Sequence, residues 1–424
     1  MMMACAFKHA LSLILAKIAG RNAVQTQADV AVAGAGPTGC FAAMTAAKLG
    51  SEVVVFEEHP EVGLPSHCAG HISIKGLNKL GLHLPDSIIE NRISGAAFYS
   101  PSGNEFRVKF PSPVTYVINR SMFDKHLARL AKDAGARFIV GTRVEKLLVD
   151  RDTVYGVQLK NEKRLESRIV IDAEGCASTL LRQINLQTLD KSQVVSAVNG
   201  EVGHADALEE GTVEVYLGQK YAPGLYAWII PRSDGSAKVG LATKFGNPRE
   251  HLNRFLSRHP VAKKKMAFNK VRNLSFHLIP LGGPIPKTYK NGFLSVGDVA
   301  SQVKPTTGGG VVMGLTCAKI AGETASEALG QNCFGEDFLL RYEERCRQAI
   351  GFDMRAMRQL RSMINRLSDR QLDRMVNLCR ELGVNEDLQR VSDIDWQGQA
   401  LLRLIKSPGI WAVSLYLLLS SLVS

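Results

Sequence analysis

A glycine-rich turn between a strand and a helix places the strongest constraint on how this chain folds. Residues 28–33 (ADVAVA) indicate a buried strand, GAGPTG occupies 34–39, and a helix of small residues is predicted at 40–49. A second strand is predicted at 51–56 (SEVVVF). Because parallel strands need a crossover connection, this unit predicts a parallel α/β sheet.

The three glycines of this turn favour a dinucleotide site. Gly34 permits the tight turn, Gly36 lets the backbone approach a pyrophosphate, and Gly39 lets the helix pack on the strand. The N-terminus of the helix then faces the phosphates. Glu57 follows the second strand and is placed to accept hydrogen bonds from ribose hydroxyls, which disfavours NADP. A glycine turn without a ligand is the alternative.

Later motifs favour FAD over NAD at this site. DAEG at 172–175 follows the strand RIVI, and Gly297-Asp298 ends another strand. A glycine-rich helix start comes next, and its glycines are Gly308, Gly309 and Gly310. An acid at a strand end before such a helix start suits a second set of contacts to one long dinucleotide. The motifs in this order therefore indicate FAD.

The middle of the chain has a different pattern from its start. Two strand-like runs at 143–160 surround a turn, which is typical of a hairpin, and further short strands are predicted between 194 and 243. Helices are predicted at 121–134 and after Pro248. A buried strand at 292–296 leads to a long helix at 311–329, and the chain beyond 335 is mainly helical.

We therefore predict an α/β fold with a doubly wound, Rossmann-like FAD-binding domain that is discontinuous in sequence. An antiparallel-sheet substrate domain and a helical C-terminal part complete it. The expected segments are an N-terminal extension at 1–27, the FAD-binding domain at 28–90 with 119–190 and 291–330, the substrate domain at 91–118 with 191–290, and a helical region with an apolar tail at 331–424.

The segment GLPSHCAGHISIKG at 63–76 brings His67, Cys68 and His71 close together in sequence. A metal site would lack a fourth ligand at a suitable spacing, so we expect no metal. An inert buried cysteine is a second interpretation. We favour a third, a cysteine beside the flavin ring, because the segment begins six residues after Glu57 and its small residues would let the backbone approach a flat ring. A thiol with an ordinary pKa near 8.5 is protonated at neutral pH and could relay a proton.

Charge and cysteine content narrow the class of partner. The 424-residue chain has a formal net charge of +12, which suggests an anionic partner such as a nucleotide or a phospholipid surface. We expect no nucleic acid, because there is no arginine-rich arm and aromatic residues are not interleaved with the basic ones. Eight scattered cysteines without a CxxC pair favour reduced thiols in a cytosolic setting.

The two ends leave alternatives open. Residues 1–20 faintly resemble a signal peptide, but Lys17 interrupts the apolar run, and an upstream extension is equally compatible. Residues 409–423 are strongly apolar yet shorter than the ~20 residues of a spanning helix, so they form a packed final helix or a helix in one leaflet. Residues 341–380 hold ten arginines and five acids, either a solvated face or a contact with lipid phosphates. We expect a cytoplasmic protein, peripheral on the inner face of the cell membrane.

Several of these motifs resemble a known family. GAGPTG, VVVFEE, NRSMFDKHLARLAKDAGA, DAEGCAS and GDVASQVKPTTGGGV resemble the FAD-dependent fold shared by aromatic hydroxylases and geranylgeranyl reductases. PSHCAGHIS and YAWIIPRSDGSAKVGLA resemble the geranylgeranyl reductase branch, and the likeness covers roughly 28–329. The chain departs from the family pattern at Ile230, where phenylalanine is usual, at Ala242, where glycine is usual, and at His71, within the stretch that is GEG in many relatives.

The resemblance implies a set of site residues. FAD would contact Thr38, Glu57, Cys68, Ala69, Arg120, Val144, Asp298, Gly310 and Val311. Arg120 would neutralise a phosphate or hold the flavin edge, and Gly308, Gly309 and Gly310 would let backbone N–H groups approach the ring. Tyr226 and Trp228 would line the substrate cavity; the alternative is an aromatic pair packed in a sheet core.

The resemblance also implies a reaction, the FAD-dependent reduction of isolated C=C bonds in geranylgeranyl chains of archaeal-type ether phospholipids. No second dinucleotide motif is visible, so the electron donor is NAD(P)H or a small redox protein. One alternative is an FAD-dependent monooxygenase or halogenase, since YAWIIP is close to the halogenase pattern WxWxIP. Others are a membrane-associated electron-transfer flavoprotein, whose iron–sulfur cluster the cysteine spacing does not support, and a lipid-binding protein with a vestigial flavin site.

Overall fold

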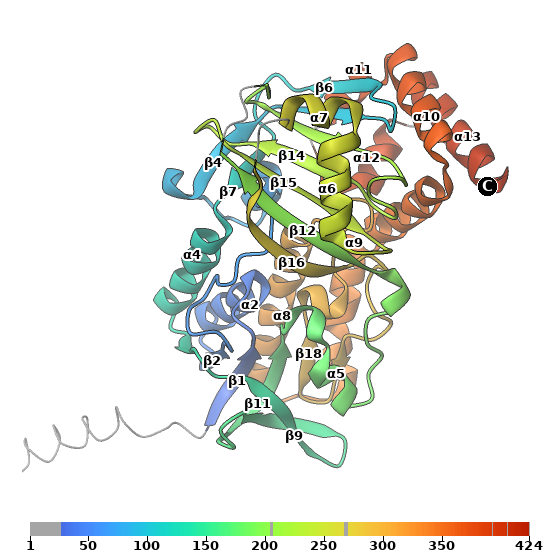
Figure 1. Cartoon of the computed structure of the whole chain (residues 1–424). Coiled ribbons are helices and arrows are strands. Elements are labelled where there is room, and N and C mark those ends of the chain that lie inside the picture. Colours follow the sequence, from blue (N-terminus) through green and yellow to red (C-terminus); the bar gives the residue numbers. More distant parts are fainter. Residues whose placement is uncertain (1–26, 204–206, 267–269, 392, 405, 424) are drawn as a thin grey trace, which may run out of the picture.

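The computed structural model describes residues 27–203, 207–266, 270–391, 393–404 and 406–423. The candidate leader at the N-terminus lies outside these residues. Within the described part, the strands form sheets of eight, seven and three strands, and the C-terminal part is helical (Figure 1). The predicted fold class is therefore confirmed.

The eight-stranded sheet has the predicted parallel centre. Its order is β17-β18-β11-β1-β2-β8, and β9 and β10 extend β11 as an antiparallel hairpin. The bounds are β1 (Gln27–Ala33), β2 (Val53–Phe56), β8 (Arg137–Ile139), β9 (Val144–Asp150), β10 (Thr153–Leu159), β11 (Arg164–Asp172), β17 (Tyr289–Lys290) and β18 (Phe293–Ser295). The pairs β1–β2, β1–β11, β2–β8 and β11–β18 are parallel. The expected strands and the 143–160 hairpin are thus confirmed.

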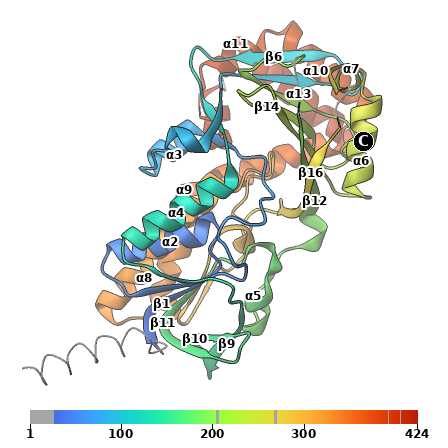
Figure 2. The same ribbon diagram turned by 60° about the vertical axis from the view of Figure 1, so that its left-hand side comes forward.

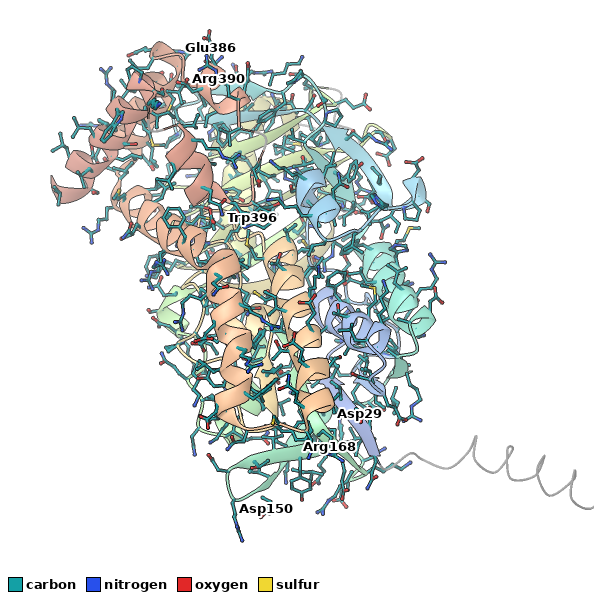
Figure 3. All side chains as sticks on the ribbon, turned by 180° about the vertical axis from the view of Figure 1, so that it is seen from behind. Asp29, Asp150, Arg168, Glu386, Arg390 and Trp396 are labelled. Atoms are coloured by element: carbon teal, nitrogen blue, oxygen red, sulfur yellow. The ribbon has the colours of Figure 1, made fainter. Side chains whose placement is uncertain are left out.

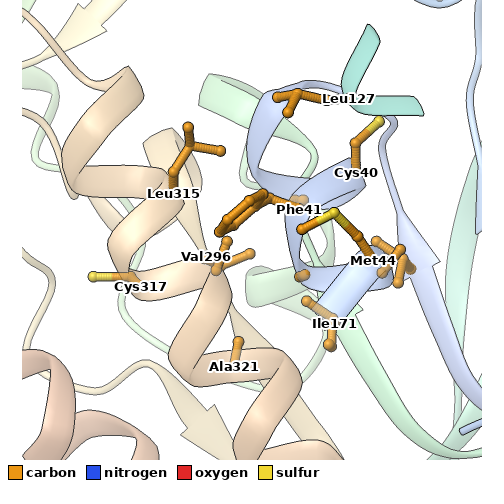
Figure 4. Close-up of a cluster of buried hydrophobic side chains, with 14 of the residues drawn as sticks. Cys40, Phe41, Met44, Leu127, Ile171, Val296, Leu315, Cys317 and Ala321 are labelled. Carbon is orange, nitrogen blue, oxygen red and sulfur yellow. The ribbon is translucent and has the colours of Figure 1, made fainter. Parts of the chain in front are cut away.

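Three helices cover one face of this sheet, and two of them, α2 and α8, are rich in small residues. They are α2 (Pro37–Lys48), α4 (Arg120–Asp133) and α8 (Val311–Gln331). Figure 4 shows side chains from α2 and α8 meeting Ile171 and Val296 in one apolar cluster. The two helices approach closely, because a Cβ on Gly322 would lie 2.7 Å from the carbonyl oxygen of Ala42. Helix α2 begins three residues earlier than predicted, since proline suits the first turn of a helix.

The seven-stranded sheet is antiparallel apart from its β5–β13 pair, in the order β16-β12-β15-β14-β13-β5-β6. The bounds are β5 (Gly95–Tyr99), β6 (Glu105–Lys109), β12 (Val194–Val202), β13 (Thr212–Tyr216), β14 (Ala227–Pro231), β15 (Ala237–Thr243) and β16 (Arg272–Pro280). The short helices α6 (Pro248–Arg258) and α7 (Pro260–Met266) pack against it through an aromatic cluster around Tyr216 and Phe255. Figure 1 shows this sheet above the parallel one.

A three-stranded sheet of β3 (His71–Ser73), β7 (Thr115–Ile118) and β4 (Ile89–Ile93) is linked to the seven-stranded sheet. Lys238 on β15 donates to the carbonyl oxygen of Ile118 at 2.9 Å. The proposed domain boundaries at 90 and 119 divide this small sheet, and the division of the chain into domains remains a proposal. The remaining short elements are α3 (Ile74–Lys79), α5 (Thr179–Gln183) and the 3₁₀ turns η1 (Asp86–Ile88), η2 (Gly175–Ala177), η3 (Lys191–Gln193) and η4 (Gly297–Ala300).

The C-terminal helices connect the two large sheets. They are α9 (Glu336–Arg366), α10 (Asp369–Glu381), α11 (Val384–Gln389), α12 (Gln397–Arg403) and α13 (Pro408–Val423). Helix α9 packs along α8 and continues beyond it, as Figures 2 and 3 show. Trp396, labelled in Figure 3, donates its indole N–H to the carbonyl oxygen of Ala349 in α9 at 3.2 Å. No helix among the described residues is both long and apolar enough to cross a bilayer.

Candidate functional site

The N-terminal glycine turn (residues 34–39) is built by its own backbone. Gly34 has φ +102°, and a Cβ there would lie 2.4 Å from the carbonyl oxygen of Ala173. A Cβ on Gly39 would lie 1.9 Å from the carbonyl oxygen of Gly34, whereas nothing lies within 4 Å of the corresponding position on Gly36. Packing within the protein therefore requires glycine at 34 and 39, while Gly36 borders open space of the kind that a pyrophosphate needs.

Glu57 fixes this turn and faces the same space. Its carboxylate accepts hydrogen bonds from the backbone N–H groups of Ala35, at 2.9 Å, and His59, at 3.0 Å. The ring Nδ1 of His59 lies 2.7 Å from Glu57 Oε1. No sequence pattern selects His59, because a histidine three residues beyond the end of β2 carries no motif of its own.

A cavity of about 300 Å³ opens in front of the glycine turn. Its wall contains Glu57 and Val144, two of the residues expected to contact FAD, together with His67 and Asp124, for which no FAD contact was expected. Arg120 pairs with Asp124 through two contacts of 3.2 Å. Burial lowers the pKa of Arg120, but the neighbouring Asp124 and Cys68 raise it overall, so the guanidinium stays charged.

Thr38 contributes to the site by packing. Its side chain packs directly on Gly297 and Gly314. A Cβ added to Gly297 would lie 2.7 Å from Thr38 Oγ1, and a Cβ added to Gly314 would lie 2.5 Å from Thr38 Cγ2. The threonine therefore joins the N-terminal turn to η4 and α8. Sequence reasoning did not identify Gly297 and Gly314 as its packing partners, since a glycine near a helix start has several explanations.

The C-terminal glycine loop (residues 304–310) lies beside Asp298. A Cβ on Gly310 would come 3.1 Å from Asp298 Oδ1, and Gly308 has φ +70°. Gly309 packs against the side chain of Lys304, and Val311 begins helix α8. Burial raises the pKa of Asp298, and the nearby charge of Arg120 opposes that shift, so the two predicted residues lie near each other.

Four side chains from distant parts of the chain hold this loop. Tyr226 donates its hydroxyl to the carbonyl oxygen of Thr307 at 2.8 Å. The other three belong to the C-terminal helical part: Asp395 pairs with Lys304 at 2.7 Å, Arg361 donates to the carbonyl oxygen of Pro305 at 3.3 Å, and Gln397 accepts from Thr306 at 2.7 Å. The predicted helical C-terminal part thus takes part in shaping the site.

Cys68 lies between the cofactor region and the seven-stranded sheet. It is half-buried, and its sulfur accepts from the N–H of Gly70 at 3.4 Å. Gly70 has φ +75°, and a Cβ there would lie 2.2 Å from the carbonyl oxygen of Ile118, so the segment turns tightly against β7. The charge of a Cys68 thiolate would act on Arg120, Tyr226 and Lys238, which places these three groups around the sulfur.

The two histidines of this segment diverge from Cys68. The ring of His67 stacks on His277 with centroids 6.2 Å apart, while His71 Nε2 lies 2.6 Å from the hydroxyl of Thr115. Among the described residues, no group of three His, Cys, Asp or Glu side chains could hold a metal ion. The Nδ1 atoms of His67 and His277 are buried without a hydrogen-bond partner in the protein, which fits a polar ligand in the cavity.

Tyr226 and Trp228 lie on the face of the seven-stranded sheet toward Cys68. Their rings meet edge to face, with centroids 6.0 Å apart. Trp228 lies flat over Gly240, where a Cβ would come within 2.5 Å of the indole, and donates to Asn199 at 3.4 Å. Both rings are half-buried, and Trp228 packs against the same apolar cluster as Ala69, around Val117 and Ile230, so it lies near the Cys68 segment.

The departures from the family pattern lie around this pair. Ile230 is buried with Val117 and Val213, and Ala242 is buried with Val195 and Ile279. Each substitution changes the volume of an apolar wall near the aromatic residues without adding a polar group. These two positions therefore alter the apolar packing around the aromatic pair, not its polarity.

Comparisons with known proteins agree with this geometry. The model of FAD-dependent oxidoreductases matches residues 29–183, and the model of the geranylgeranyl reductase catalytic domain matches residues 193–274. A digeranylgeranylglycerophospholipid reductase from Methanopyrus kandleri is 34% identical over 86% of this chain and 92% of that protein. One from Methanocaldococcus jannaschii is 32% identical over 85% of this chain and 93% of that protein.

Solved structures show the same relationship. A geranylgeranyl bacteriochlorophyll reductase-like protein from Thermoplasma acidophilum has a TM-score of 0.82 and 26% identity, and the alignment covers 92% of this chain and all of that one. A flavin-dependent brominase, with a TM-score of 0.67 and 16% identity over 92% of this chain and 98% of its own, shares the fold alone. With its FAD-type glycine turn and reductase-type second sheet, the chain belongs to the digeranylgeranylglycerophospholipid reductase family of FAD-dependent oxidoreductases.

Proposed function

We propose that this protein saturates the isolated C=C bonds of geranylgeranyl chains, with those of archaeal-type ether phospholipids as its substrates. The observation that carries the proposal is the meeting of three parts: Cys68, Tyr226 and the C-terminal glycine loop. Tyr226 belongs to the region that matches the geranylgeranyl reductase catalytic domain. The sequence relatives named for phospholipid reduction support the choice of substrate.

The residues proposed to hold FAD belong to the two glycine segments and the structure between them. They are Gly34, Gly36, Thr38, Gly39, Glu57, Cys68, Ala69, Arg120, Val144, Asp298, Gly308, Gly309, Gly310 and Val311. The fit is supported by the open space at Gly36 and by the unpartnered Nδ1 atoms of His67 and His277. Arg120, charged and half-enclosed, is suited to the phosphates or to the flavin edge.

Saturating one C=C bond takes a hydride on one carbon and a proton on the other. When bound and reduced, FAD supplies the hydride, and a nicotinamide or a small redox protein is the external two-electron donor that restores it. The chain's own residues must deliver the proton, position the apolar chain and exclude water. We assign the proton to the thiol of Cys68, and the walls of the substrate cavity to Tyr226 and Trp228.

Replacement of Cys68 tests the proton assignment. Cys68→Ser and Cys68→Ala should keep the bound-flavin spectrum and lower alkene reduction, by about a hundredfold or more for alanine, because the proton donor is lost. Reduced enzyme would be incubated anaerobically with geranylgeranyl phospholipid, and the hydrogens gained counted by mass spectrometry. The matched control is Cys333→Ser, at an exposed cysteine away from the site. Full activity in Cys68→Ala would mean that Cys68 is an inert cysteine with no part in the reaction.

We also propose peripheral contact with a membrane through α13. Five apolar residues at helical spacing, Trp411, Leu415, Leu418, Leu419 and Leu422, are 44–70% exposed on one face of this helix. Its other side packs on α10, which carries the exposed Arg370 and Arg374. Within the arginine block at 341–380, Arg345 pairs with Glu327 and Arg347 with Glu343, so part of its positive charge is already engaged.

Vesicle binding tests this contact. The triple variant Leu415→Ser, Leu419→Ser, Leu422→Ser should bind anionic vesicles at least about tenfold more weakly, since apolar area and nearby arginines both contribute. High salt should weaken the binding of the unmodified protein. The matched control replaces three exposed apolar residues elsewhere, Leu49, Val149 and Phe245, with serine. Equal binding by the two triple variants would count against α13 as the contact.

A further inference from the structure

A second cavity lies apart from the cofactor pocket. It measures about 710 Å³ and shares no lining residue with the first cavity. Its walls come from the connection at 187–193, the connection at 280–286 and the face of α9 at 358–366. A volume of this size is typical of sites for small molecules or for the polar part of a larger one.

Arg361 is the most deeply buried charge in this cavity. Its side chain is only 6% exposed, and its one described hydrogen bond runs from Nη1 to the carbonyl oxygen of Pro305. Burial lowers the pKa of Arg361 to about 10, and no described carboxylate opposes that shift, yet the group remains charged at neutral pH. A buried cation without a counter-charge is costly, because water no longer solvates it. An anionic ligand would remove that cost.

The surroundings of Arg361 are also basic. Arg358, Arg366 and Lys244 line the same cavity, and Asp190 is the one described carboxylate among the lining residues. Asp190 accepts a hydrogen bond from the backbone N–H of Ser192 at 2.9 Å, so part of its charge is already engaged. The lining also has neutral polar side chains: Gln187, Thr188, Gln193, Ser301, Gln359, Ser362 and Asn365. Several donors around a buried guanidinium match an anion with several oxygens.

We propose that this cavity binds a phosphate group and that Arg361 is its principal ligand. Two sources share this chemistry, the phosphate of a phospholipid substrate and the 2′-phosphate of a nicotinamide donor. The inference rests on the proposed function only for the identity of the molecule that carries the phosphate. Arg361 also donates to the carbonyl oxygen of Pro305, which belongs to the C-terminal glycine loop. A phosphate bound to Arg361 would therefore lie against the loop that contains Gly308 and lies beside Asp298.

The first test measures phosphate binding by full-length, FAD-loaded protein. Inorganic phosphate, compared with chloride at equal ionic strength, should raise the unfolding temperature and shift the flavin absorption spectrum. In Arg361→Gln the phosphate affinity should fall about ten- to a hundredfold, the loss expected for a charged hydrogen bond. The control is Arg355→Gln, which removes the same charge from α9 at a position outside the cavity, and it should behave as the unmodified protein.

The same variants separate a ligand site from a structural role. Without phosphate, Arg361→Gln should unfold close to the temperature of the parent, because removal of an unpaired buried charge offsets the lost hydrogen bond to the carbonyl oxygen of Pro305. A large drop in unfolding temperature together with unchanged phosphate affinity would mean that Arg361 serves only to hold Pro305, and would overturn the proposal. So would phosphate that stabilises the parent no more than chloride does.

Two further arms identify the source of the phosphate. If the donor supplies it, NADPH should bind more tightly than NADH, and Arg361→Gln should abolish that preference. If the lipid supplies it, detergent micelles of geranylgeranyl phospholipid should lose affinity in Arg361→Gln, while geranylgeraniol, which lacks phosphate, should not. Failure of both arms overturns the proposal. Arg361-dependent phosphate binding in a protein that reduces no alkene would instead reject the proposed function and keep this site.

Discussion

The two glycine segments of the site are held in place in opposite ways. The N-terminal turn is fixed mainly by backbone packing: Gly34 packs on the backbone of Ala173 after β11, Gly39 packs on Gly34, and Glu57 accepts from the N–H of Ala35. The C-terminal glycine loop is fixed by side chains 56 to 91 positions away, including the Lys304–Asp395 and Thr306–Gln397 contacts, whose partners are each 91 residues apart. One segment is specified mainly by backbone packing and the other by polar contacts with distant side chains.

This difference teaches where mutations should act. In the N-terminal turn, an added Cβ meets backbone atoms that cannot move away, so the effect is steric. In the C-terminal loop, loss of a partner leaves a buried polar or charged group unsatisfied, so the effect is electrostatic and originates in the helical C-terminal part. The predictions below test this contrast, from the largest expected effect to the smallest.

Gly39→Ala should cause the largest loss. Its Cβ would lie 1.9 Å from the carbonyl oxygen of Gly34, so the turn must open or α2 must shift. We expect a loss of about 4–5 kcal/mol in unfolding free energy, or failure to fold, measured by chemical denaturation. Gly36→Ala is the control, because nothing lies within 4 Å of its Cβ position. It should keep stability but retain FAD poorly; equal stability loss in both variants would contradict the steric explanation.

Asp395→Ala should cause the second-largest loss of stability, and it tests how the C-terminal glycine loop is held. It leaves Lys304, 7% exposed, as a buried charge without its partner, which costs about 3 kcal/mol. FAD retention should also weaken, although Asp395 lies in the C-terminal helical part. The double variant Lys304→Met, Asp395→Leu should recover most of the stability, because it removes both charges. Asp393→Asn is the control, since its lysine partners are more than 40% exposed, and it should cost about 1 kcal/mol.

The comparison also explains how much could be predicted from sequence. The parallel sheet, the hairpin at 143–160 and the N-terminal turn could be predicted because each strand and turn has a recognisable pattern in its own sequence, even where the partners are distant in the chain, as β1 and β11 are. The roles of Asp395, Gln397 and Arg361 could not be predicted, because nothing in their local sequence indicates that they reach the C-terminal glycine loop. The contact between His67 and His277 was missed for the same reason, since it joins the loop between β2 and β3 to the distant strand β16.

Glu57→Gln separates the two roles of Glu57, which are holding the N-terminal turn in shape and binding the cofactor. The amide oxygen can still accept from the N–H of Ala35, so the turn should keep its shape. The N–H of His59 loses its acceptor, so the protein should lose about 1 kcal/mol of stability. The charged acceptor for ribose hydroxyls is lost, which should weaken FAD binding by about 1.5–3 kcal/mol. Titration of FAD-free protein with FAD, followed by flavin fluorescence, measures this. Glu57→Ala should lose both functions, and an Ala variant no worse than Gln would show that the Ala35 contact contributes little.

The smallest effect is expected at His277, where the two sheets meet over the cofactor pocket. Burial, with smaller contributions from His67 and Arg120, lowers the pKa of His277 from 6.5 to about 4. The unfolded chain therefore binds a proton more readily than the folded one, so this stability is present above pH 6.5 and is lost as the pH falls toward 4. Between neutral pH and pH 5.5 the loss should be roughly 1 kcal/mol.

In His277→Gln this acid-dependent loss should be smaller, while stability near pH 8, where the parent histidine is neutral in both states, serves as the internal reference. Denaturation curves at a series of pH values measure the difference for FAD-free and FAD-loaded protein. Since the Nδ1 atoms of His67 and His277 have no partner in the protein, FAD phosphates near them would favour the protonated rings. FAD-loaded protein should then keep its stability to lower pH than the FAD-free form. Identical pH profiles for the two forms would mean that these histidines do not face the cofactor.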